Sequence, residues 1–277
     1  IEQSNMIISQ YFSANLEQQP FPFKFEITEV MSYVSNKFSA CPFAKCFESN
    51  LTVLKKLVHY MSKLKMIGKE EFDYIFNNFV VKYYFVEGGI LSDPDYIQLC
   101  VEFVNNILET SPRLVIQSSY FESFLVSEFL KLLLVVREKF TIIPLCKFWI
   151  KLLNNKRYDQ DCVTYVNSLF SSPSSDCLGY KLVKNCFITI LNSNRSEVMQ
   201  YSDVIRTLVS KHPLYCKKWL QMCLLEDQDL CEVLHRSANS GVNHAQFIEK
   251  LMITSGSKRA CIVINDWYLQ CNGLPHY

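Results

Sequence analysis

Apolar residues recur every three or four positions between residues 92 and 137, in two runs that a proline separates. This spacing gathers side chains on one stripe of an α-helix, so it predicts two consecutive amphipathic helices. Asp93 and Pro94 form a helix start, and the Ser-Pro at 111–112 ends the first helix because the residue before proline leaves the α region. The second helix is expected from about Ser119. One such pair cannot bury both stripes, so neighbours of the same kind must cover them.

The same spacing continues along the chain, and no strand-like alternation interrupts it. Asp176 and Ser196 are expected as helix caps, and Gly88-Gly89 as a helix stop. Pro144 is expected in the first turn of its helix, where proline is tolerated. The further predicted helices cover residues 2–15, 26–38, 50–65, 70–86, 141–154, 159–170, 176–191, 196–209, 213–225, 228–237, 243–253 and 258–271.

Seven glycines and nine prolines among 277 residues are few, which favours helices with short turns over an all-β or loop-rich fold. The interval from Asp93 to Lys139 matches the repeat of about 40 to 47 residues that is typical of HEAT or armadillo helix pairs. We therefore expect an all-α, superhelical solenoid of HEAT-like antiparallel helix pairs over residues 1–277, with residues 226–277 as C-terminal capping helices. An irregular α-helical bundle is the alternative.

Three features bear on the setting of this chain. It begins at Ile1 without an initiator methionine, and a helical array needs a polar cap at each free end, so we expect the C-terminal arch of a longer protein. Most of the 12 cysteines occupy apolar positions of helical patterns, which favours a reducing, intracellular compartment over a disulfide framework. The most apolar run, residues 130–136, is too short to span a bilayer and contains Lys131. We expect a soluble protein.

No motif of a known reaction stands out in the sequence. A net charge of +1 gives no overall field for nucleic acid or a membrane surface. There is no G-x-S-x-G, no Walker loop and no C-x-x-C pair. Cys231 and His235 have the i, i+4 spacing of some zinc ligands, but a buried cysteine beside a surface histidine explains them as well. We expect no enzyme, no cofactor and no metal.

Polar and basic residues on the predicted second helices are candidates for binding a partner. Lys181, Lys184 and Ile188 follow one another along the non-core face of the helix predicted at 176–191. An ordinary solvated face explains any one such residue. On the concave side of a solenoid the same residues would meet an acidic partner. The full candidate set is Ser127, Lys131, Lys181, Lys184, Ile188, Lys217, Lys218 and Gln221.

Four segments, in their order and spacing, resemble the C-terminal end of β-karyopherins of the importin-13 and transportin-3 group. They are SDPDYIQLCVEFVNNILETSPRLVI from Ser92, LCKFWIKLL from Leu145, SDVIRTLVSKHPLYCKKWLQMCL from Ser202 and KRACIVINDWYLQCNGL from Lys258. The shared features are an acidic Pro-Asp helix start, a Ser-Pro break and a Cys-x-Gly-Leu terminus. The extra segment at 159–175, and Asn272 where relatives often have arginine, suggest a divergent, fungal member.

The resemblance implies a HEAT solenoid that carries protein cargo through nuclear pores and shuttles between nucleus and cytoplasm. It implies control by Ran in its GTP form, held mainly by N-terminal repeats that this chain lacks, and binding of Phe-Gly nucleoporins. It implies no direct contact with nucleic acid or membrane. The alternative function is a static HEAT-type scaffold subunit of a large protein assembly.

Overall fold

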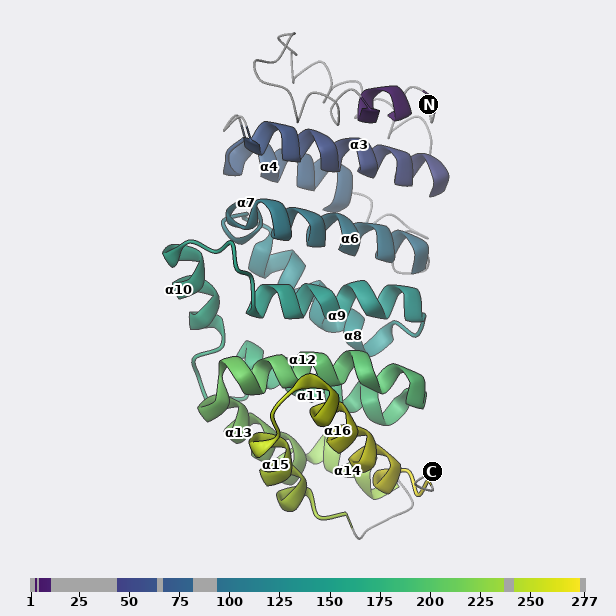
Figure 1. The fold of residues 1–277 in the computed structure, drawn as a ribbon, viewed down its shortest axis with the longest axis vertical. Helices are drawn as coiled ribbons and strands as arrows, with labels where there is room; N and C mark the ends of the chain where they lie inside the picture. Colours follow the sequence, from purple (N-terminus) through teal and green to yellow (C-terminus); the bar gives the residue numbers. More distant parts are fainter. Residues whose placement is uncertain are drawn as a thin grey trace. The chain divides into compact units, whose positions relative to one another are not determined.

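A computed structural model describes residues 3, 5–10, 44–63, 67–81, 94–236 and 242–274 of the chain. All regular structure in these ranges is helical, and none of it is strand (Figure 1). The predicted all-α class is confirmed. No helix in the described ranges has both the length and the apolar character that crossing a bilayer requires.

The chain divides by packing into two compact units, Ile1–Ser123 and Phe124–Tyr277. Each unit is described by itself. The organisation of residues 1–277 as one array, with residues 226–277 as its cap, stays a prediction.

Unit 1 is built around a pair of long helices, α3 (Ala44–Lys63) and α6 (Pro94–Thr110), which pack against each other. The short helices of this unit are α4 (Lys69–Phe76), η1 (Asn77–Val81) and α7 (Pro112–Ile116). Asp73 of α4 accepts hydrogen bonds from the Ser118 hydroxyl (2.5 Å) and from the Ser119 amide (3.1 Å), so a carboxylate fixes the turn after α7. The core consists of apolar side chains, among them Leu54, Leu57, Val58, Phe72, Val101 and Leu108.

Unit 2 contains most of the remaining helices, and they pack in two rows. The segment η3 (Phe121–Val126) leads into α8 (Ser127–Val135). The helices that follow are α9 (Lys139–Leu153), α10 (Gln160–Leu169), α11 (Leu178–Asn192), η4 (Arg195–Glu197), α12 (Val198–Lys211), α13 (Pro213–Gln221), η5 (Met222–Glu226), α14 (Gln228–Arg236), α15 (His244–Ile253) and α16 (Ser257–Cys271).

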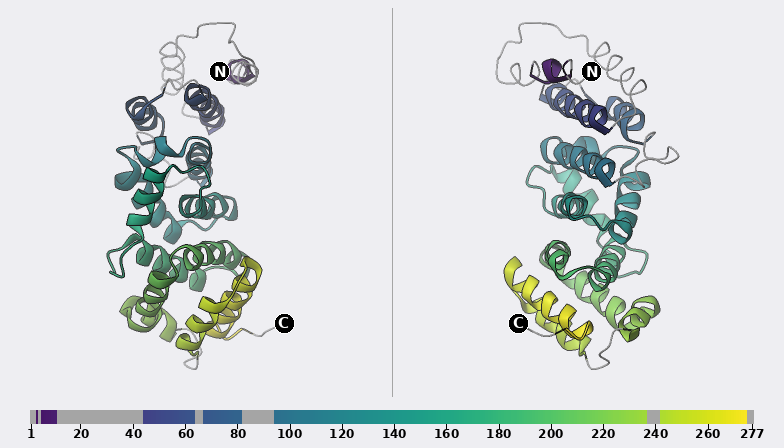
Figure 2. Two further views of the ribbon diagram at one scale, coloured as in Figure 1. Left: turned by 60° about the vertical axis from the view of Figure 1, so that its left-hand side comes forward. Right: turned by 90° about the vertical axis from the view of Figure 1, so that its right-hand side faces the viewer.

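In the first row, α9 packs on α12 and α12 packs on α16. In the second row, α8 packs on α11, α11 on α13 and α13 on α15. The last helices of the two rows, α15 and α16, lie side by side (Figure 2). Within each row, two helices in contact are therefore separated in the sequence by at least one other helix.

Side chains of α11 fix its position on α8. The Thr189 hydroxyl donates to the carbonyl of Leu133, and the Asn185 amide donates to the carbonyl of Leu130, both at 2.8 Å. These bonds are directional, so they fix the register of the two helices where apolar packing alone would allow sliding.

Aromatic side chains fill the centre of unit 2. Trp149, Trp219 and Trp267 are almost fully buried. Trp267 stacks on Phe247 at 5.0 Å between ring centroids and meets Phe187 edge-to-face at 5.1 Å. Ten cysteines whose side chains the structure describes carry free thiols, and eight of them are buried. They pack as small apolar side chains.

Most predicted helices are confirmed within a few residues, including the break at 111–112 and the helices that begin after Asp159, His212 and Asn243. The prediction for Pro144 is wrong. The amides of Thr141 and Ile142 both bond to the Glu138 carbonyl at 3.0 Å, so α9 is already formed when the chain reaches the proline in the second turn.

The cap prediction for Asp176 is also wrong, because α11 begins one residue later than such a cap requires, with Cys177 at its N-cap. Ser196 lies inside the 3-10 turn η4 that precedes α12, and it caps no α-helix. The helix predicted at 26–38, the Asp93 cap and the Gly88-Gly89 stop lie outside the described residues.

Candidate functional site

The eight predicted partner-binding residues all lie on helices of the second row of unit 2. Ser127 and Lys131 are on α8. Lys181, Lys184 and Ile188 are on α11, and Lys217, Lys218 and Gln221 are on α13. Because α8, α11 and α13 pack on one another in succession, three separate stretches of sequence contribute to one layer of helices.

Some of these cations are neutralised within the chain. Lys131 forms an ion pair with Glu128 of its own helix at 2.7 Å. Lys217 forms one with Glu249 of α15 at 2.7 Å, which joins the last two helices of the row. The pair of Lys217 with Glu249 is exposed at both ends, so it contributes little to stability. Both pairs reduce the positive charge open to a partner.

Lys181 and Lys218 differ from the other lysines of this set. Both side chains are exposed, and neither lies within ion-pair distance of an acidic group in the described part of the chain. Ile188, Gln221 and Ser127 are half-buried. Of the surface predicted to bind an acidic partner, only the Lys181 and Lys218 cations therefore remain exposed without an ion pair in the described part of the chain.

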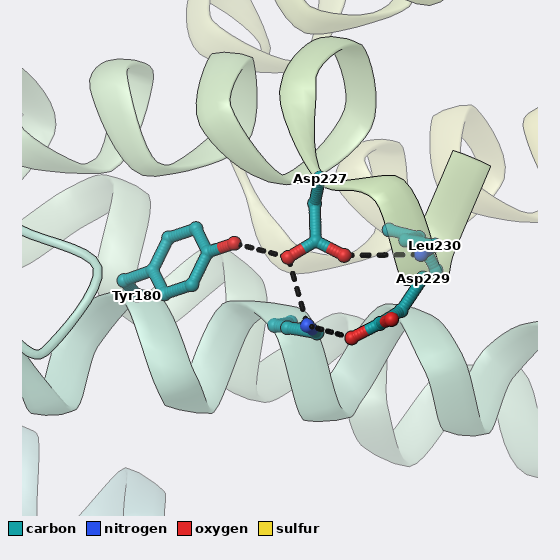
Figure 3. A network of polar contacts seen from close by, with 5 residues as sticks. Tyr180, Asp227, Asp229 and Leu230 are labelled. Carbon is teal, nitrogen blue, oxygen red and sulfur yellow. Dashed lines mark hydrogen bonds and ion pairs between the residues drawn. The ribbon is translucent and has the colours of Figure 1, made fainter.

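Lys184 belongs instead to a polar network between α11 and the start of α14. Figure 3 shows this network with Tyr180, Asp227, Asp229 and Leu230 labelled. Its ammonium lies 2.8 Å from Asp227 and 3.0 Å from Asp229. The Tyr180 hydroxyl donates to the same oxygen of Asp227 at 2.5 Å. The other oxygen of Asp227 accepts from the amide of Leu230 at 3.0 Å, which satisfies one of the free donors at the helix start.

The burial of these groups determines how strongly they interact. The side chains of Lys184 and Asp227 are 22% and 10% exposed, whereas that of Asp229 is 83% exposed. Solvent screens the pair with Asp229 far more than the pair with Asp227. Asp227 is therefore the partner that holds Lys184 in place.

The protonation of the network follows from its contacts. Burial alone would raise the pKa of Asp227, but hydrogen bonds from Lys184, Tyr180 and the Leu230 amide hold that pKa below its usual value. Burial would lower the pKa of Lys184, but its bonds to Asp227 and Asp229 raise it. Burial and the bond to Asp227 raise the pKa of Tyr180. At neutral pH the carboxylate and the ammonium are charged, and the phenol is a neutral donor.

This arrangement fixes the start of α14 on α11 and contains no activated nucleophile or general base. Asp227 also acts at the start of α14 through its bond to the Leu230 amide, and sequence reasoning missed Tyr180. Tyr180 and Asp227 are 47 residues apart in the sequence, and no local pattern connects them.

Metal ligands and reactive thiols are the other chemical possibilities. No group of three or more His, Cys, Asp or Glu side chains within the described ranges could hold a metal ion. The side chain of His235 is not among those that the structure describes. His244 accepts a hydrogen bond from Trp267 at 3.1 Å. Burial raises the pKa of the Cys100 and Cys216 thiols to about 12, which leaves them protonated and unreactive.

The sequence matches no protein-family model and no curated protein sequence.

Proposed function

We propose that this chain is the C-terminal part of a nuclear transport receptor of the β-karyopherin type. It would bind protein cargo and carry it through nuclear pores under the control of Ran in its GTP form. The resemblance of the four segments quoted above suggests this function. The single structural observation that supports it is the packing of alternate helices on one another in unit 2.

Two rows of alternating helices are what stacked HEAT-like pairs produce. In this proposal the second row, α8, α11 and α13, faces the concave side and binds cargo. Lys181 and Lys218 supply charge for an acidic surface of the cargo. Phe-Gly segments of nucleoporins bind between helices of the first row, and Ran binds mainly to N-terminal repeats that precede this chain.

Reversible loading follows from the energetics of such stacks. Each helix pair contacts only its neighbours, so the curvature of the stack can change at modest cost. Binding of one partner can then alter the affinity for another, with the same coupling free energy in both directions. Loss of cargo on binding of Ran would be one such coupling.

The test is a pull-down with the full-length protein, with and without Ran loaded with GTP. A transport receptor retains a set of proteins whose amounts change when Ran-GTP is added. If no bound protein responds to Ran-GTP, the proposal is wrong.

A static scaffold subunit is the second candidate function. The contact of Lys184 with Asp227 joins α11 to the start of α14, and that of Lys217 with Glu249 joins α13 to α15. Both contacts favour a fixed geometry. A scaffold would co-purify with its partners in constant stoichiometry and would not respond to Ran-GTP.

A further inference from the structure

We draw no further inference here: the strongest candidate, the open apolar groove between the start of α12 and α16 where Met199 and Ile262 are exposed, carries none because nothing in the structure shows what covers it.

Discussion

The six-membered ring of Trp219 lies directly against Gly179, in the first turn of α11: a β-carbon added at Gly179 would be 2.1 Å from Cη2 of the indole. The indole nitrogen donates to the carbonyl of Ser172 at 2.7 Å, so Trp219 also holds the loop before α11. The absence of a side chain at one residue therefore allows α11 and α13 to approach closely.

Replacing Gly179 by alanine should destabilise unit 2 by about 1–3 kcal/mol, the usual cost of overpacking. In an exposed helix the same change would stabilise by about 1 kcal/mol, because alanine is the better helix former. The sign of the effect therefore tests the contact. The measurement is unfolding in guanidinium followed by tryptophan fluorescence, which reports on unit 2 because all three tryptophans lie there.

The control for this prediction is Lys181→Ala, an exposed change two residues further along the same helix. It should alter the free energy of unfolding by no more than about 0.5 kcal/mol. A stabilising effect of Gly179→Ala would contradict the close contact with Trp219.

Replacing Asp227 by asparagine should cost about 1–3 kcal/mol, because Lys184 loses the charged partner with which it is largely buried. Asp229→Asn removes the same charge from an exposed position and should change the free energy of unfolding by less than about 0.5 kcal/mol. Both can be measured by guanidinium unfolding. Equal effects of the two changes would show that burial does not distinguish these carboxylates.

His212 should make the stability of unit 2 depend on pH. Burial lowers its pKa, and the neighbouring charge of Lys211 lowers it further, so the unfolded chain takes up a proton more readily than the folded one. The stabilisation from neutral His212 is complete above the unfolded pKa of about 6.5, and it is lost as the pH falls through the folded pKa.

His212→Phe preserves the stacking on Phe170, whose ring centroid is 5.4 Å from the imidazole, and it removes the titration. The free energy of unfolding, measured at about pH 7.5 and about pH 5.5, should fall less in this variant than in the unchanged chain. If the two proteins lose the same amount, His212 does not contribute to the pH dependence.

Charge reversal tests the second row as a binding surface. Lys181→Glu combined with Lys218→Glu should reduce the amount of partner protein retained in the pull-down, while the free energy of unfolding changes by less than about 1 kcal/mol because both residues are exposed. Lys139→Glu with Lys147→Glu makes the same change of charge on exposed positions of α9, in the first row. An equal loss with both pairs would point to overall charge and not to the second row.

Sequence reasoning found most of the helices because their signals are local. The apolar spacing between residues 94 and 110, the proline at 112 and the caps Asp159 and Asn243 each act within a few residues of the chain. The position of Pro144 within its helix was predicted wrongly because the start of α9 depends on where the turn after α8 ends. No side-chain cap marks that point in the sequence.

Part of the candidate site was also predictable. Lysines spaced along the polar side of a helix mark an exposed face, as Lys181 does, but the pattern does not show which of them the fold neutralises. Lys184 lies one helical turn after Lys181, so the pattern predicts that it is exposed as well. In the structure it forms ion pairs with Asp227 and Asp229, which are more than 40 residues further along the chain. Many acidic residues are equally compatible partners until the helices are packed.

The sequence alone thus determines that this chain forms amphipathic helices, and where most of them begin and end. Tertiary structure decides which helices contact each other, which cations stay free, where an apolar patch remains uncovered between α12 and α16, and why Gly179 must lack a side chain. The physical reason is range. Helix formation depends on residues within about one or two turns, whereas packing joins residues such as Thr189 and Leu133, 56 positions apart, whose pairing no local preference specifies.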